Sequence, residues 1–180
     1  MIRTERLELV PATPALTRAA LHGPRALAAG LGAAVPATWP PEYLDPASLE
    51  FTLERLAAGA DQAGWWLHFV VLRDAGGGRT LVGSAGYKGP PSDDGTVEVG
   101  YGIVSDHRRR GYASEVVRGL VAHAFTLPAV KRVIAETLAG LAPSIGVLRK
   151  CGFRPVGEGS EPGVIRFELE RAEHTAEARY

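Results

Sequence analysis

The sequence contains very little cysteine, no excess of either charge and no long hydrophobic run. The single cysteine, Cys151, cannot form a disulfide within the chain, so the fold does not depend on an oxidising compartment. The 20 basic and 20 acidic side chains cancel, and this balance implies neither a nucleic-acid nor a membrane partner. No apolar run reaches the length of a membrane span, and the first residues lack a signal-peptide core. We therefore expect a cytoplasmic protein.

The composition is typical of a single globular domain. The 180 residues are 46% hydrophobic and 22% charged, as in ordinary soluble proteins. We expect one domain over residues 1–171, followed by a charged, alanine-rich tail over residues 172–180. The five histidines are scattered without the spacing of metal ligands, so we expect no metal. A homodimer is the default expectation for the assembly.

Hydrophobic periodicity divides the chain into strands and helices. Strands are predicted over residues 4–10, 65–72, 80–87, 97–104, 130–137, 153–157 and 164–169. Helices are predicted over residues 14–22, 25–31, 46–58, 111–125 and 144–150, with Thr13 as the cap of the first. Strands interleaved with helices predict a single α+β or layered α/β domain with a mixed sheet.

The junction between the strand at residues 97–104 and the helix that follows predicts an anion site. The first turn of a helix has unpaired N–H groups that carry partial positive charge. Gly111 removes the side chain that would block close approach, while Arg108, Arg109 and Arg110 add positive charge. Together these features predict a phosphate cradle built mainly from backbone. The alternative is a basic surface loop before an ordinary amphipathic helix.

Two common phosphate-binding motifs are absent from this turn. A nucleotide P-loop needs a lysine and then a serine or threonine directly after its last glycine, and residues 111–113 offer neither. A dinucleotide fingerprint needs three glycines, of which the turn has one. The predicted ligand is therefore a diphosphate compound of another class than those that these two motifs bind.

Two sequence blocks resemble those of the GCN5-related N-acetyltransferase (GNAT) superfamily. The string Arg108-x-x-Gly111-x-Ala113, after an E-V-G-Y strand, is similar to motif A, the turn that holds the pyrophosphate of acetyl-coenzyme A. The segment 144–153 is similar to the later block S-x-x-V-L-x-K-x-G-F. The resemblance spans residues 80–170 and is strongest to the branch of ribosomal-protein N-terminal acetyltransferases.

The resemblance implies a mixed, mostly antiparallel twisted sheet of about seven strands with helices on both faces. In that fold the strand at 97–104 and the strand at 130–137 splay apart, and the pantetheine arm enters the gap. The implied residues that bind the cofactor are Ile103, Val104, Arg108, Arg109, Arg110, Gly111, Tyr112, Ala113, Ser114, Leu141 and Ser144. Leu141 departs from the pattern, because the branch usually has an asparagine there that hydrogen-bonds coenzyme A.

The segment 33–46 is a proline-rich loop, and in the resembling fold such a loop covers the acceptor side. Trp39 and Tyr43 are therefore candidates for contact with substrate. The alternative, which we favour for Trp39, is that its side chain fills the core, because large aromatic residues are mostly buried.

Acyl transfer to an amine needs a base, an oxyanion donor and a proton for the thiolate. Glu98 shares a strand face with the two neighbouring glycines and could take the amine proton through water. Alternatively, it is a structural carboxylate bound to a neighbouring strand, or a charge that orients the amine. A backbone N–H near Val104 is the predicted oxyanion donor. Ser144, Tyr101 and Tyr87 are the candidate proton donors, and water alone is the alternative.

These features predict an N-acetyltransferase that uses acetyl-coenzyme A and acts on a primary amine, either a protein N-terminus or a small amine. Transfer is expected to be direct, because Cys151 has no neighbouring histidine base and reads as a small buried residue. One alternative is an acyl-coenzyme A sensor without catalysis, which Leu141 permits. A third interpretation, nucleic-acid binding through the three arginines, predicts a steep salt dependence that a neutral chain is not expected to show.

Overall fold

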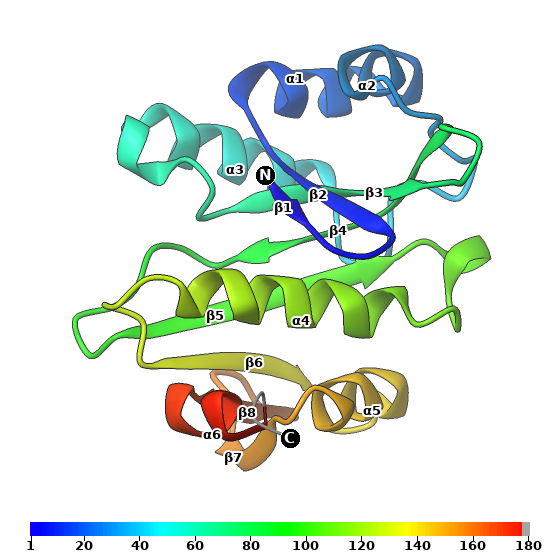
Figure 1. Ribbon diagram of the computed structural model, residues 1–180. Helices are drawn as coiled ribbons and strands as arrows, with labels where there is room; N and C mark the ends of the chain where they lie inside the picture. Colours follow the sequence, from blue (N-terminus) through cyan, green and yellow to red (C-terminus); the bar gives the residue numbers. More distant parts are fainter. Residues whose placement is uncertain (178–180) are drawn as a thin grey trace.

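The computed structural model describes residues 1–177 of the chain, with the side chains of residues 1–174. It contains one eight-stranded sheet in the order β1-β2-β3-β4-β5-β6-β8-β7 (Figure 1). The strands are β1 (Ile2–Arg3), β2 (Leu7–Pro11), β3 (Leu67–Arg73), β4 (Arg79–Tyr87), β5 (Thr96–Ile103), β6 (Arg132–Leu138), β7 (Arg154–Glu158) and β8 (Val164–Glu170). Among these strands, β5 and β6 form the one parallel pair.

The helices cover both faces of the sheet. They are α1 (Pro14–His22), α2 (Pro24–Leu31), α3 (Pro46–Ala57), α4 (Tyr112–Phe125), α5 (Ala142–Lys150) and α6 (Arg171–Glu177). The predicted cap is confirmed, because Thr13 Oγ1 accepts a hydrogen bond of 3.2 Å from the Leu16 N–H. Within the described part of the chain, no helix has both the length and the apolar character needed to cross a membrane.

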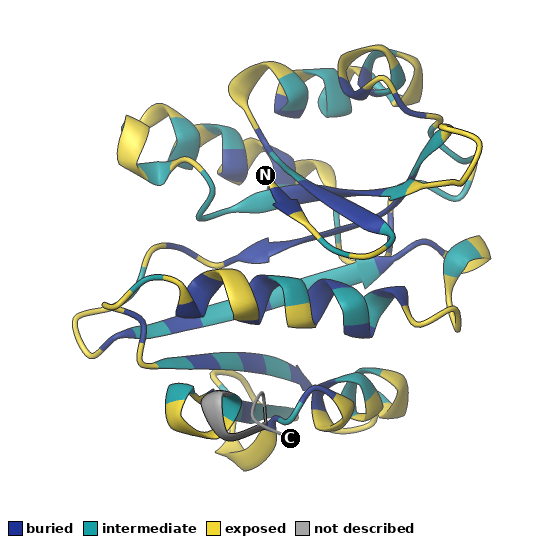
Figure 2. Cartoon of the chain, viewed as in Figure 1, coloured by how far each residue is buried: buried dark blue, intermediate teal, exposed yellow. Residues whose placement is uncertain are grey.

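Alternation along β3 divides the hydrophobic core into two parts. Val70 belongs to the larger part, which packs under α4 with Leu120. Phe69 and Val71 face the opposite side and pack with Leu27 of α2. Figure 2 shows the buried residues in dark blue along the strands and on the helices that pack against them. The mixed, mostly antiparallel sheet with helices on both faces confirms the predicted fold class.

The prediction of a single first strand over residues 4–10 is wrong. The chain forms β1, turns at residues 4–6 and returns antiparallel as β2. The side chain of Thr4 closes this turn, because its Oγ1 accepts a hydrogen bond of 3.1 Å from the Leu7 N–H. The extra short strand gives the sheet eight strands rather than about seven.

The C-terminal segment continues as a helix. Residues 171–177 form α6, which follows β8 directly. The end of the predicted tail, residues 178–180, lies outside the described residues.

The pairing between β5 and β6 is short, and this feature creates the site. Thr96, Val97 and Glu98 of β5 pair with residues 132–134 of β6, and the ladder ends there. Farther along, in the described part of the chain, β5 pairs only with β4 and β6 only with β8. The two central strands therefore separate beyond Glu98, as the resemblance implies.

Candidate functional site

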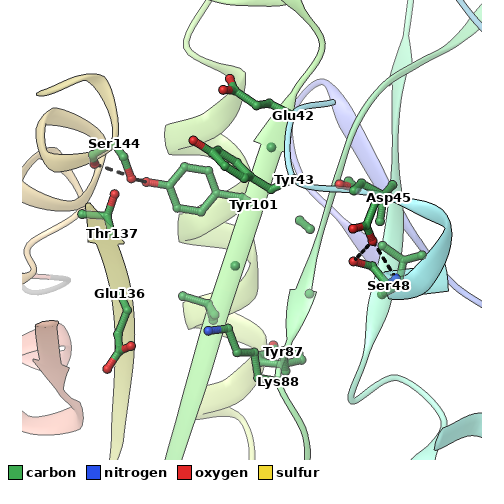
Figure 3. A pocket seen from close by; sticks show the side chains of 18 of the residues that line it. Glu42, Tyr43, Asp45, Ser48, Tyr87, Lys88, Tyr101, Glu136, Thr137 and Ser144 are labelled. Carbon is green, nitrogen blue, oxygen red and sulfur yellow. Dashed lines mark hydrogen bonds between the residues drawn. The ribbon is translucent and has the colours of Figure 1, made fainter. Parts of the chain in front are cut away.

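A cavity of about 1010 Å³ opens where β5 and β6 separate (Figure 3). Its lining comes from α3 and the loop before it, from β4, β5 and β6, from the start of α5 and from the β7–β8 turn. Tyr101 and Ser144 lie at one side of the cavity, whereas Asp45 and Ser48 lie at the other (Figure 3). The cavity is therefore lined by helices from opposite faces of the sheet, since α3 packs with α1 and α5 packs with α4.

Two predicted catalytic residues meet at the α5 side of the cavity. The Tyr101 hydroxyl lies 3.0 Å from Ser144 Oγ and 3.2 Å from the Ser144 carbonyl oxygen. Burial raises the pKa of Tyr101 to about 12, although its hydrogen bond with Ser144 acts in the opposite direction. The phenol is therefore neutral near pH 7 and has a proton to donate. Leu141, the residue before α5, also lines the cavity.

Glu98 lies at the point where the β5–β6 ladder ends. It does not line the cavity, although Gly100 and Gly102 on the same strand face do. Its buried Oε1 atom forms an ion pair with the ammonium group of Lys88, which does line the cavity. The Lys88 N–H also donates to the Glu98 carbonyl oxygen at 2.9 Å. Glu98 is thus held by the neighbouring strand beside the cavity.

The oxyanion donor was predicted near Val104, and the N–H of Val104 itself is not free for this role. The Val104 N–H donates to the Val82 carbonyl oxygen of β4 at 3.0 Å and is therefore already engaged. In an antiparallel ladder the backbone groups of successive residues point to opposite edges. Those of Tyr101 and Ile103 consequently point toward the gap, and the Arg108 Nε group that bonds to the Ile103 carbonyl oxygen at 3.0 Å lies there.

The third candidate proton donor, Tyr87, is committed elsewhere. Its ring lines the cavity, but its hydroxyl donates to the Leu120 carbonyl oxygen of α4 at 2.7 Å. Burial raises the pKa of Tyr87 well above its usual value. Its proton therefore stays in a buried hydrogen bond directed away from the gap.

The start of α4 has the geometry of an anion cradle. Gly111 precedes the helix with φ 82°, in the left-handed region, and its carbonyl accepts the first helical bond from the Glu115 N–H at 3.1 Å. In the described part of the chain, no acceptor is found for the N–H groups of Tyr112, Ala113 or Ser114. A Cβ atom at Gly111 would meet only the guanidinium of Arg6, at 3.4 Å. The backbone is therefore open to a ligand.

The residues predicted to bind the cofactor fall into two groups. Leu141 and Ser144 line the cavity. The others lie outside it, along the end of β5 and the turn into α4; they are Ile103, Val104, Arg108, Arg109, Arg110, Gly111, Tyr112, Ala113 and Ser114. Ile103 and Val104 are buried, whereas the side chains of the three arginines are exposed. The cradle therefore follows the cavity along the chain and is separate from it.

Trp39 and Tyr43, the two aromatic residues of the loop before α3, lie in different environments. Tyr43 lines the cavity, is 72% exposed and has a left-handed φ of 69°. Trp39 does not line the cavity and packs on Phe69 with ring centroids 6.0 Å apart. The core interpretation of Trp39 is thus the one that the structure favours.

The sequence analysis missed Glu136, a carboxylate of β6 that lines the cavity. Its Oε atoms accept hydrogen bonds from Ser160 Oγ at 2.6 Å and from Arg166 Nε at 2.9 Å. Burial favours the neutral acid, but these bonds outweigh it and lower the pKa of Glu136. Strand alternation places Glu136 opposite the buried residues of β6, but no local signal shows that this face lines a cavity.

Comparison with known proteins gives a family model, curated relatives and solved structures. The model of the acetyltransferase (GNAT) domain matches residues 6–154. The uncharacterized N-acetyltransferase YjdG of Bacillus subtilis is 33% identical over 73 residues, which are 41% of this chain and 44% of that protein. The uncharacterized N-acetyltransferase p20 of Bacillus licheniformis is 30% identical over 77 residues, 43% of each protein. The match therefore spans less than half the length of these relatives.

Solved structures share the fold over most of their length. A GNAT-family acetyltransferase from Bacillus anthracis has a TM-score of 0.64 at 18% identity, covering 96% of this chain and 98% of that one. RimL, a ribosomal L7/L12 alpha-N-protein acetyltransferase in complex with coenzyme A, has a TM-score of 0.63 at 15% identity, covering 93% and 95%. MccE, a microcin C7 self-immunity acetyltransferase in complex with acetyl-coenzyme A and AMP, has a TM-score of 0.64 at 11% identity, covering 93% of both chains.

Proposed function

This chain belongs to the GNAT acetyltransferase family, and from that premise we propose that it transfers the acetyl group of acetyl-coenzyme A directly to a primary amine. The acceptor is the N-terminus of a protein or a small amine. The observation that carries the proposal is the cavity between β5 and β6, which is lined from both faces of the sheet and is followed along the chain by the cradle at α4. The neighbours RimL and MccE contain coenzyme A and acetyl-coenzyme A, which supports this choice of cosubstrate.

The residues of the cradle suit a diphosphate. The N–H groups at the start of α4 supply partial positive charge without a competing acceptor. Gly111 leaves the backbone accessible, and the exposed side chains of Arg108, Arg109 and Arg110 surround it with positive charge. In this proposal the acyl arm then runs along β5 to the gap beside Tyr101.

In the proposed reaction the amine nitrogen attacks the thioester carbonyl carbon, the C–S bond breaks and the thiolate takes a proton. The backbone N–H of Tyr101, which points toward the gap, is our proposed oxyanion donor. The neutral Tyr101 hydroxyl, bonded to Ser144, is our proposed donor to the thiolate. These two roles place the leaving sulfur at the α5 side of the cavity.

For the proton of the attacking amine we propose Glu98, acting through water. Its carboxylate lies at the end of the β5–β6 ladder and forms an ion pair with Lys88. The same ion pair is also what a purely structural carboxylate would form. The two roles differ in the pH dependence of turnover that they predict.

The experiment that tests the proposal combines calorimetry with an assay of thiol release. We expect acetyl-coenzyme A to bind and free thiol to appear only when an amine from a library of N-terminal peptides and small amines is added. Binding without amine-dependent thiol release would instead support the acyl-coenzyme A sensor, which the loss of an amide side chain at Leu141 permits.

Gly111→Glu tests the location of the cradle. A carboxylate about 5 Å from a phosphate costs about 3 kcal/mol at an effective dielectric constant of about 20, so affinity should fall on the order of 100-fold. Gly111→Ala is the matched control, because it adds the same left-handed strain, about 1–2 kcal/mol, without the charge. Equal affinity of the two variants would place the diphosphate elsewhere.

A further inference from the structure

The turn between β1 and β2 is bound to the first turn of α4 by a dense set of hydrogen bonds. Glu115 accepts bonds of 2.7 Å from both Nε and the backbone N–H of Arg6, and one of 2.5 Å from Thr4 Oγ1. Arg6 Nη2 lies 2.7 Å from Glu115 Oε2. Burial favours the neutral form of Glu115, but the bonds from Thr4 and Arg6 lower its pKa. The carboxylate is therefore ionised at the start of the helix.

The guanidinium of Arg6 also reaches the cradle itself. Arg6 Nη1 donates to the Arg110 carbonyl oxygen at 3.1 Å. In a planar trans peptide the carbonyl and the following N–H point in opposite directions. A fixed Arg110 carbonyl therefore directs the Gly111 N–H away from Arg6, toward the open side of the turn. The guanidinium also lies 4.6 Å from the centroid of the Tyr112 ring.

The backbone of this turn needs such support. Arg109 has φ 63° and Gly111 has φ 82°, so two residues of the turn are left-handed within three positions. For a residue with a side chain, this conformation costs about 1–2 kcal/mol. Arg110 lies between them, and its carbonyl is the group that Arg6 holds.

Arg6 also balances a charge that would oppose a diphosphate. Glu115 is an anion in the first turn of α4, and the anion site at that helix end lies close to it. Without the guanidinium, the carboxylate would repel a bound phosphate through a partly buried, weakly screened interaction.

From these contacts we propose that Arg6 is a positioning residue for the cosubstrate: it orients the Gly111 N–H and neutralises Glu115, and thereby sets the affinity for the diphosphate. The inference rests on the proposed function, since it assumes that coenzyme A binds at the cradle. It assigns to the N-terminal turn a role in binding a ligand at a second turn, where the contacted Arg110 lies 104 positions farther along the chain.

The test compares Arg6→Met with Arg73→Met. Arg73 is the matched control because its Nη2 group holds the same turn, through the carbonyl oxygens of Thr4 and Glu5 at 2.8 and 2.9 Å, and has no contact with the cradle in the described part of the chain. Binding of coenzyme A and of pantetheine, which lacks the diphosphate, is measured by calorimetry. Thermal unfolding of each variant measures the loss of stability separately.

We expect Arg6→Met to weaken coenzyme A binding about tenfold, the typical effect of losing a hydrogen-bonded charge. Pantetheine binding should stay within about twofold, and the kinetic change should fall on the KM for acetyl-coenzyme A rather than on kcat. Arg73→Met should lower the unfolding temperature without changing either affinity. Equal losses in the two arginine variants, or equal losses for both ligands, would overturn the proposal.

Two further variants keep the test decisive. If Arg6→Met does not fold, Arg6→Lys takes its place in the test. Lysine retains the ion pair but cannot bond to Glu115 and Arg110 together, so this variant should weaken coenzyme A binding about threefold. Wild-type affinity in Arg6→Lys would overturn the proposed orientation of the Gly111 N–H. The double variant Arg6→Met/Glu115→Gln removes the unpaired carboxylate as well. It should recover only the part of the lost coenzyme A affinity that is due to repulsion by Glu115. A wild-type protein that binds no coenzyme A would refute the proposed function itself.

Discussion

At the scale of single residues, the two hydroxyls of Tyr101 and Ser144 are the best-placed groups in the cavity. They lie 3.0 Å apart, and burial keeps the Tyr101 phenol neutral. In the proposed reaction the leaving thiolate is a weak base, because the pKa of its thiol is near that of cysteine, about 8.5. A neutral donor in a hydrogen bond can stabilise such a group without giving up its proton before the C–S bond breaks.

Tyr101→Phe is expected to lower kcat on the order of 100-fold while changing the KM for acetyl-coenzyme A much less. The ring and its packing against the core remain, so the loss measures the hydroxyl alone. Ser144→Ala should give a smaller loss, because water can replace the second hydroxyl in the hydrogen-bonded pair. Unchanged turnover in Tyr101→Phe, measured by thiol release, would show that water protonates the thiolate.

Glu98→Gln distinguishes a base from a structural carboxylate. If Glu98 takes the amine proton, the kcat/KM of the variant should fall on the order of 100-fold and its dependence on pH should change shape. Lys88→Met removes the partner of Glu98 but leaves the carboxylate. Similar losses of stability in both variants, with the pH profile of the wild type, would leave Glu98 as the structural partner of Lys88.

At the scale of elements, the loop before α3 lies directly on β5. A Cβ atom on Gly102 would be 3.2 Å from the Cβ of Pro41 and 3.6 Å from the Glu42 carbonyl oxygen. The same loop is bonded to the turn before α4 through Arg108, whose Nη2 group lies 3.4 Å from Glu42. The position of the loop, and with it the proposed acceptor side of the cavity, therefore depends on a glycine in the strand.

Gly102→Ala is expected to destabilise the protein by about 1–3 kcal/mol, the usual cost of overpacking. Gly100→Ala is the matched control, because it lies on the same face of β5 and its Cβ atom would meet nothing within 4 Å. Urea unfolding should show a lower midpoint with an unchanged slope for Gly102→Ala only. Equal midpoints for the two variants would show that the loop adjusts without cost.

At the scale of the whole molecule, acid should destabilise the fold through a buried histidine. His68 lies inside the sheet, with its Nδ1 atom 3.1 Å from the Trp66 carbonyl oxygen, and burial lowers its pKa from 6.5 to about 4. The unfolded chain therefore takes up a proton at a higher pH than the native state. The contribution of His68 to the free energy of unfolding is fully present above about pH 6.5 and is lost as the pH falls from 6.5 toward 4.

His68→Phe should reduce the change in the free energy of unfolding between pH 6.5 and pH 4. In the wild type His68 contributes as much as about 3 kcal/mol to this change. The ring shape is retained against Tyr87, whose ring centroid lies 6.3 Å away. His22→Gln, at an exposed position of α1, should leave the dependence unchanged. The measurement is the free energy of unfolding by urea at a series of pH values. An unchanged slope in His68→Phe would assign the acid lability to other groups.

Local signals predicted the cradle and most of the elements because backbone chemistry acts over a few residues. The Thr13 cap and the helix after Gly111 follow from unpaired N–H groups and from the left-handed freedom of glycine. Tyr101 and Ser144 were each candidate proton donors, but the hydrogen bond between them was not predicted. No local spacing connects them, because the two residues lie 43 positions apart.

The sequence alone determined the class of fold, the limits of most strands and helices, and the polar turn at the start of α4, since periodicity and capping are properties of neighbouring residues. The tertiary structure decided where β5 and β6 part, that Lys88 holds Glu98, that Glu136 lines the cavity, and that Arg6 reaches α4. Each of these depends on strand register and on contacts between segments distant in sequence, because they arise only when the sheet has formed and the helices have packed on it.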